Sequence, residues 1–101
     1  MRKQDAGASS DFRIFETDEF QKKIRLLASI DSQFIQRKLL DYVYPQLRKD
    51  PVFGLNIKKL KGYVPETWRY RIGRFRIFYL IDSTEKIVSI LSVDHRRDAY
   101  K

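Results

Sequence analysis

The sequence predicts an α+β domain in which a small antiparallel β-sheet carries an N-terminal helical hairpin packed on one face. Apolar residues recur at helical spacing over residues 18–45, interrupted by a link of only a few residues. Three alternating segments separated by short turns follow over residues 67–93. With one further strand in front, the predicted order of elements is β-α-α-β-β-β.

A chain of 101 residues is long enough for one compact core and too short for two. Residues 1–10 are small and polar without periodicity, which predicts a disordered leader before a single domain at residues 11–101. There is no cysteine and no apolar run near the roughly 20 residues that span a bilayer. We therefore expect a cytoplasmic protein that does not insert into a membrane.

The N-terminal elements follow from local patterns. The segment "FRIFE" at residues 12–16 alternates apolar and polar residues, which predicts a strand. Asp18 is expected to cap the first helix, with Gln21 as its capping-box partner. The second helix is expected to begin at Asp31 and to kink or end at Pro45. The apolar residues at helical spacing are Phe20, Ile24 and Leu27 in the first helix and Ile35, Leu39, Tyr42 and Val43 in the second.

The C-terminal half is expected to form a three-stranded meander. Residues 48–66 contain prolines and glycines throughout and are predicted to be loop. Gly73 and Arg74 are predicted to form a two-residue hairpin turn of type II′, because glycine suits its first position. The three strands are predicted at about residues 67–72, 75–81 and 87–93.

This turn fixes the pairing of the first hairpin. Arg71 is expected to face Arg76, and Arg69 to face Phe78, with all four side chains on one side of the sheet. Like charges directly opposite one another destabilise a sheet, so folding does not explain the arginine pair. The alternative is a basic face that only keeps the protein soluble.

The next turn, "DSTE", is expected to continue the pattern. It would place Ser89 beside Phe78 and Leu91 beside Arg76, with Val88 and Ile90 on the core side. The arginine face would then be a basic cluster on a partly apolar floor. Such a surface offers both phosphate contacts and a platform for stacking bases.

The net charge of +8 is concentrated in residues 57–79, which carry seven basic residues and one acid, Glu66. A local excess of this kind attracts polyanions, of which nucleic acid is the commonest. The seven are Lys58, Lys59, Lys61, Arg69, Arg71, Arg74 and Arg76.

Few kinds of catalytic site are compatible with these residues. One histidine, no cysteine and scattered acids predict no metal site, and there is no phosphate-binding glycine loop or serine elbow. Arginines could stabilise the charge that builds on a phosphate when a ribose 2′-OH attacks it. Tyr100, with its pKa lowered by nearby cations, or His95 could be the general base of such RNA cleavage. Alternatively, His95 is a structural residue and Tyr100 anchors the end of the chain.

Three segments in this order resemble the RelE/ParE superfamily of toxins from prokaryotic toxin–antitoxin pairs. They are "KKLKG" (58–62), "YRIGRFRIFYLID" (70–82) and "LSVDHRRDAY" (91–100), and the resemblance covers about residues 12–101. It implies the fold described above and a cognate antitoxin as partner. RelE-like members cut mRNA in the A site of the small ribosomal subunit (30S) without metal, whereas ParE-like members poison DNA gyrase.

Carried over by motif, the resemblance implies a metal-free and cofactor-free endoribonuclease. Tyr100 would be the general base, with His95 able to share that role, and Arg96 would help to protonate the leaving oxygen. Usual ParE-like chains lack the two basic positions on the first of these strands and the terminal tyrosine, which favours the nuclease over a gyrase inhibitor or an inactive relative. The phosphate would be held by Arg69, Arg71 and Arg76, and further RNA contacts are expected from Lys58, Lys59, Lys61, Arg74 and Phe78.

Overall fold

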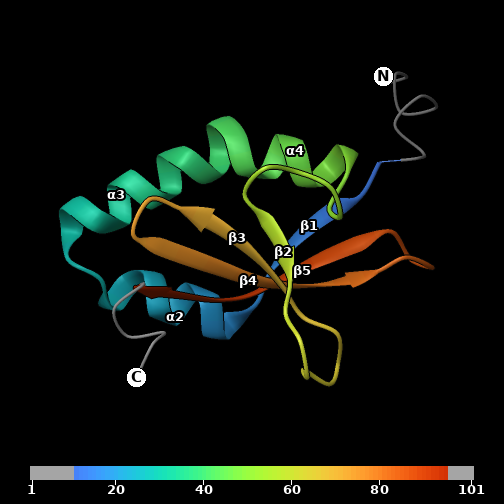
Figure 1. The fold of residues 1–101 in the computed structure, drawn as a ribbon. Coiled ribbons are helices and arrows are strands. Elements are labelled where there is room, and N and C mark those ends of the chain that lie inside the picture. Colours follow the sequence, from blue (N-terminus) through green and yellow to red (C-terminus); the bar gives the residue numbers. More distant parts are fainter. Residues whose placement is uncertain (1–10, 96–101) are drawn as a thin grey trace.

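The computed structural model describes residues 11–95 (Figure 1). The predicted leader at residues 1–10 lies outside this range. The elements are β1 (Arg13–Glu16), α2 (Asp18–Leu26), α3 (Ser29–Lys38), a π-helical segment η1 (Leu39–Val43), α4 (Tyr44–Lys49), β2 (Ile57–Lys59), β3 (Trp68–Ile72), β4 (Phe75–Asp82) and β5 (Ile87–His95).

The predicted α+β fold class is confirmed, with helices packed on one face of a sheet. The sheet has the order β1-β5-β4-β3-β2 and is mixed rather than wholly antiparallel, because β1 runs parallel to β5. The short strand β2 was missed, since residues 48–66 were expected to be loop throughout. The hydroxyl of Thr17, just after β1, donates to the Ile90 carbonyl at 2.7 Å. This bond ties the start of α2 to β5.

The helix starts differ slightly from those expected. Thr17, not Asp18, is the N-cap of α2, and its hydroxyl accepts a hydrogen bond from the Phe20 N–H at 3.2 Å. Thr17 has the extended backbone of a cap residue, which leaves Asp18 in the first turn. The second helix begins at Ser29, two residues before the expected Asp31.

Pro45 was expected to kink or end the second helix, and the helix does not end there. Helix α3 runs through η1 directly into α4, where Pro45 occupies the first turn. A proline lacks an N–H and its ring clashes with the carbonyl four residues earlier in an α-helix. In η1 the turn is wider, and the Tyr44 N–H donates to the Leu39 carbonyl five residues back. The π-helical turn lets the helix continue past the proline.

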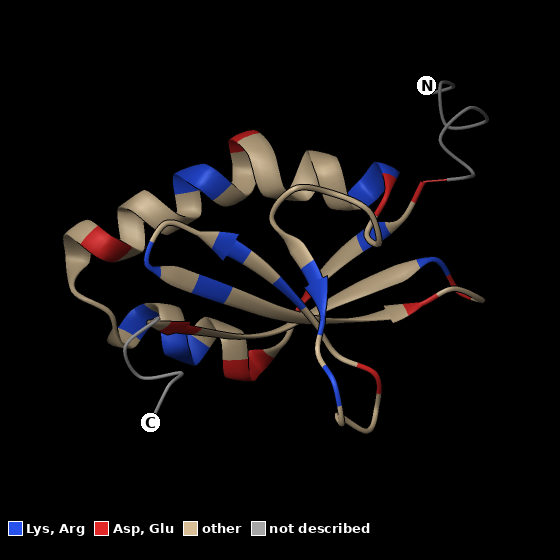
Figure 2. Cartoon of the chain, in the orientation of Figure 1, with Lys and Arg blue, Asp and Glu red and all other residues tan. Residues whose placement is uncertain are grey.

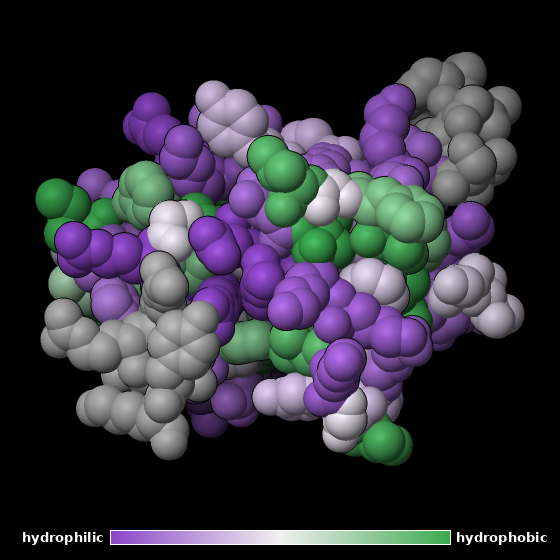
Figure 3. Space-filling view, viewed as in Figure 1, coloured by the Kyte–Doolittle hydropathy of each residue, from purple (hydrophilic) through white to green (hydrophobic). Residues whose placement is uncertain are grey.

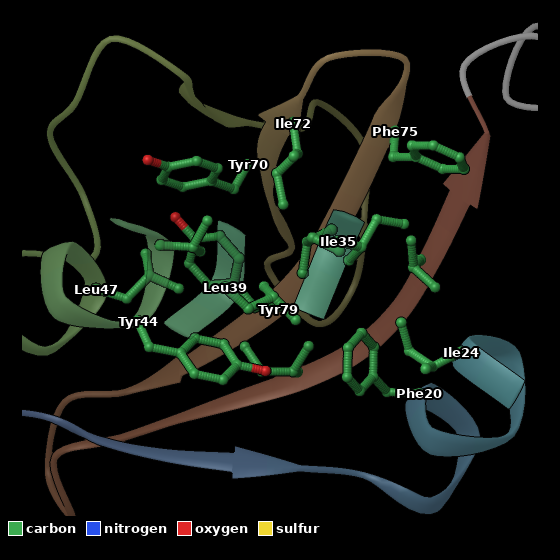
Figure 4. Packing of buried hydrophobic residues seen from close by; sticks show 14 of the residues in the cluster. Phe20, Ile24, Ile35, Leu39, Tyr44, Leu47, Tyr70, Ile72, Phe75 and Tyr79 are labelled. Atoms are coloured by element: carbon green, nitrogen blue, oxygen red, sulfur yellow. The ribbon is translucent and has the colours of Figure 1, made fainter. Parts of the chain in front are cut away.

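One hydrophobic core lies between the helices and one face of the sheet (Figure 4). Along β4 the buried side chains alternate with partly exposed ones, so the core-facing residues are every second residue. The fully buried core side chains include Phe20, Ile35, Leu39, Leu47, Ile77, Tyr79, Val88 and Ile90. In residues 11–95 the structure has no helix that is both long and apolar enough to cross a bilayer.

Two tyrosines are buried in the core, and the hydroxyl of each one forms a hydrogen bond inside the protein. Tyr44 donates to Glu16 Oε2 at 2.5 Å, and Tyr79 donates to the Pro51 carbonyl at 2.7 Å. Burial raises the pKa of Tyr79, and burial together with the hydrogen bond to Glu16 raises the pKa of Tyr44. Both tyrosines therefore stay neutral in the folded protein at pH values where the unfolded chain would ionise them.

Alkaline pH is expected to destabilise the fold through these tyrosines. The contribution of these two neutral tyrosines to the free energy of unfolding is fully present below pH ~10. Above that pH it is lost at about 1.4 kcal/mol per pH unit for each tyrosine. Urea unfolding of wild type and Tyr79→Phe between pH 8 and 11 measures this, because lysine titration is common to both proteins. The free energy of unfolding should fall less steeply with pH in the variant. Parallel curves would show that Tyr79 does not contribute.

Candidate functional site

The face of the sheet turned away from the helices, called here the open face, carries the predicted arginines. The first hairpin has the expected register, with Arg71 opposite Arg76 and Arg69 opposite Phe78. Gly73 has a φ of +57° and Arg74 has no positive φ, as a type II′ turn requires. Figure 2 shows the basic positions of β3 and β4 side by side. The arginine pair predicted from the sequence is therefore confirmed.

Strand β2 brings one lysine to this cluster. Lys58 is opposite Arg69, so its side chain starts on the open face. Lys59 is opposite Trp68, and its Nζ forms an ion pair with Glu66 at 2.9 Å. Of the two adjacent lysines, Lys58 thus belongs with the arginines, and Lys59 is paired with an acid.

The remaining predicted RNA contacts lie around this cluster. Lys61 is an exposed residue of the loop after β2, and Arg74 is exposed in the β3–β4 turn. Phe78 is partly buried on the open face, between Arg69 and Ser92. The structure therefore places the apolar side chain within the cluster and the two cations outside the paired strands.

The register between β4 and β5 differs from the prediction. The turn is shifted by one residue, with Asp82 opposite Ile87 and Lys86 at a φ of +60°. A β-bulge between Phe78 and Tyr79 shifts the pairing once more. As a result, Ser92 and not Ser89 lies opposite Phe78, and Asp94 and not Leu91 lies opposite Arg76. Val88 and Ile90 are on the core side, as expected.

Asp94 changes the electrostatics of the site. Arg76 lies between Arg71 on one side and Asp94 on the other, so a carboxylate offsets part of the repulsion between the two arginines. Asp94 also accepts from Lys23 Nζ of α2 at 3.1 Å. The sequence pattern had not indicated Asp94, because only the observed turn and bulge bring it to this position.

The carbonyl of Asn56 organises the edge of the cluster. It accepts from Arg69 Nη1 at 3.1 Å and from the backbone N–H of Arg71 at 3.0 Å. One backbone oxygen thereby orients the guanidinium of Arg69 and fixes the strand that carries Arg71. Preorganised cations of this kind stabilise charge without having to reorganise.

A cluster of four cations, with one carboxylate beside it, occupies neighbouring positions of β2, β3, β4 and β5 on the open face. Hydrophilic side chains extend across the middle of the molecule in Figure 3, over β2 and β3. Spacing of neighbouring strands by about 5 Å lets several of these cations reach one phosphate group. The four cations are Lys58, Arg69, Arg71 and Arg76, and the carboxylate is Asp94.

His95 is not brought together with the arginines. It lies opposite Phe75, a core residue, and the two rings meet edge to face with centroids 5.1 Å apart. Its side chain therefore lies on the helix-covered side of the sheet. Arg96 and Tyr100 lie outside the described residues. In residues 11–95 no three His, Cys, Asp or Glu side chains are grouped so as to hold a metal ion.

Comparison with known proteins identifies the family. Residues 14–100 match the family described as "ParE toxin of type II toxin-antitoxin system, parDE". RelE1 of Methanocaldococcus jannaschii is 41% identical over 51 residues, so the match spans 50% of this chain and 56% of that protein.

Solved structures show the same fold. The toxin–antitoxin complex RelBE2 of Mycobacterium tuberculosis contains a chain similar to this one, with a TM-score of 0.67, 23% identity and coverage of 85% of this chain and 99% of that one. A chain of the RelE–RelB complex of Pyrococcus horikoshii has a TM-score of 0.64 and 20% identity, and the match covers 85% of this chain and 96% of that one. A YoeB/ParE toxin of Agrobacterium tumefaciens has a TM-score of 0.64 and 14% identity, and the match covers 83% of this chain and 98% of that one. From the family match and these shared folds, the chain belongs to the RelE/ParE toxins of type II toxin–antitoxin systems.

Proposed function

We propose that this toxin is an endoribonuclease that cleaves mRNA on the ribosome, at the A site of the 30S subunit. The observation that carries the proposal is the pair Arg71 and Arg76, directly opposite each other and flanked by Arg69 and Lys58. Facing arginines disfavour the sheet, whereas a bound phosphate would compensate their charge. RNA supplies such a phosphate next to a nucleophile, its own 2′-OH.

The proposed reaction needs neither a metal nor a cofactor. The 2′ oxygen forms a bond to the adjacent phosphorus while the bond from phosphorus to the 5′ oxygen breaks. The products are a 2′,3′-cyclic phosphate and a 5′-hydroxyl. A general base takes the 2′-OH proton and a general acid returns a proton to the 5′ oxygen. Arg69, Arg71 and Arg76 neutralise the phosphate oxygens.

The second candidate is a gyrase-inhibiting toxin without nuclease activity, which the match to the ParE family favours. Induced expression with parallel measurement of mRNA integrity and of plasmid supercoiling separates the two. Cut transcripts with normal supercoiling support the nuclease. Intact transcripts with lost supercoiling support the gyrase inhibitor and overturn the proposal.

The structural relatives from M. tuberculosis and P. horikoshii were solved as complexes with their antitoxins. We propose that this toxin also has a cognate antitoxin and that an acidic segment with interspersed apolar residues covers its open face. Phe78 among the arginines would contact the apolar residues of that segment.

The double variant Arg71→Glu/Phe78→Asp is therefore expected to weaken antitoxin binding strongly, because it reverses one charge and places another on the apolar contact. Calorimetric titration with purified antitoxin measures the affinity, and Arg37→Glu at an exposed position of α3 is the control for reversing one positive charge elsewhere on the surface. Wild-type affinity in the double variant would place the antitoxin on another surface.

A further inference from the structure

A groove of about 480 Å³ lies between the helix formed by α3 and η1 and the edge of β3. It is at the end of the sheet where the β3–β4 turn comes close to α3, as the ribbon in Figure 1 shows. It is referred to here as the helix–sheet groove. Its volume is in the range of about 300–1,000 Å³ that binding sites for small molecules occupy. The residues that line it include Phe34, Lys38 and Tyr42 from the helix and Asn56, Arg71 and Gly73 from the sheet side.

The helical side of the groove presents two aromatic rings with a cation between them. Phe34, Lys38 and Tyr42 are spaced four residues apart and so share one face of the helix. Lys38 Nζ lies 5.8 Å from the centroid of the Phe34 ring and 4.9 Å from that of Tyr42. The two aromatic residues are nevertheless 43% and 61% exposed. A stabilising contact within the helix accounts for the position of Lys38, but it does not require both rings to remain open to solvent.

The groove is continuous with the arginine cluster. Arg71 pairs with Arg76 on the open face and also lines the groove. Strand β2 pairs with residues 68–70 of β3, and the Asn56 carbonyl accepts from the Arg71 N–H, so this segment leaves only the last residue of β3, Ile72, uncovered at the edge next to the groove. At Gly73 an added Cβ would lie 3.9 Å from the Phe34 ring, which places the hairpin turn against the helix. An RNA strand bound across the arginines can therefore pass around the edge of β3 into the groove.

We propose that the helix–sheet groove binds a nucleotide of single-stranded RNA next to the one that is cleaved. Its base stacks on Tyr42, and its phosphate contacts Lys38 and Arg71. The choice of RNA rests on charge complementarity, since the described lining residues include two cations and no acid. Aromatic rings interleaved with cations are the arrangement that binds stacked bases and their phosphates. This assignment builds on the proposed nuclease function and adds a substrate contact outside the arginine cluster.

The test uses a fluorescent single-stranded RNA with 2′-O-methyl riboses, which cannot be cleaved, and the purified toxin. Tyr42→Ala is expected to weaken binding roughly five- to 150-fold, the range for loss of one aromatic–base stack, and Tyr42→Phe should retain binding. Lys38→Gln should weaken binding and lower the dependence of log affinity on log salt by about 0.7, the value for one phosphate contact. The controls are Leu40→Ala, a residue 68% exposed in the same π-helical turn, and Lys22→Gln on α2.

A parallel assay of mRNA cleavage separates this proposal from the function on which it builds. If Tyr42→Ala and Lys38→Gln bind and cleave RNA as wild type does, the groove assignment is overturned and the nuclease function stands. If wild type binds RNA without cleaving it and these variants bind weakly, the binding of RNA by the groove is supported and the nuclease function fails. If the variants lose antitoxin binding but keep RNA binding, the groove is a protein-docking surface and the assignment is overturned.

Discussion

Arg76→Ala is expected to lower the rate of RNA cleavage about 10²- to 10³-fold, the usual loss when one preorganised donor to a developing negative charge is removed. Arg76 is the central cation of the open face, with Arg71 opposite on β3 and Asp94 opposite on β5. Single-turnover cleavage of ribosome-bound mRNA measures the loss.

The same substitution should leave the domain folded. Removing Arg76 relieves the repulsion from Arg71 but also removes the attraction to Asp94, and each cross-strand term amounts to about 0.2–1 kcal/mol. The midpoint of urea unfolding should therefore change little. Arg37→Ala, the same change at an exposed position of α3, is the matched control and should cleave normally. An Arg76→Ala protein that cleaves at the wild-type rate would remove this arginine from the mechanism.

The pairing in the first hairpin could be predicted because one local feature, the two-residue turn at Gly73, determines it. Gly73 permits the positive φ of a two-residue turn, and every pair along β3 and β4 then follows from the alternation of side chains. The position of the arginine pair on the face away from the core follows in the same way. No long-range information is needed to place Arg71 opposite Arg76.

The pairing of β4 with β5 in the second hairpin could not be predicted from the sequence. Lys86 takes a positive φ although it is not glycine, in a turn shifted by one residue from the expected one, and the bulge after Phe78 depends on how β4 packs between two other strands. Neither feature has a local sequence pattern. The error in register concealed Asp94, the one acidic partner of the cluster within the described strands.

The parallel pairing of β1 and the continuous helix across Pro45 depend on tertiary structure. Strand β1 pairs with the free edge of β5, and helix α2 packs against that strand. The π-helical turn at Leu39–Val43 accommodates the proline and keeps Leu39 and Val43 buried in the core. Core packing thus overrides a strong local signal for helix termination.

The register of β5 also bears on which group is the general base. His95 lies opposite Phe75 and contacts its ring, on the side of the sheet away from Arg71 and Arg76. The buried tyrosines Tyr44 and Tyr79 have raised pKa values, which disfavours the tyrosinate that a base requires. Tyr100, which the family resemblance assigns as the base, is therefore the residue we propose for this role.

Tyr100→Phe is expected to lower the rate of RNA cleavage by roughly 10²- to 10⁴-fold, because it keeps the ring but removes the oxygen that would take the 2′-OH proton. His95→Gln should cost little, since the contact with Phe75 is a packing contact on the core side. Single-turnover cleavage by both variants, with binding of the uncleavable RNA as a control for affinity, decides between them. A histidine base would reverse the two effects and make the rate fall on acidification as the imidazole gains its proton. A Tyr100→Phe toxin that cleaves at full rate would exclude Tyr100 as the base.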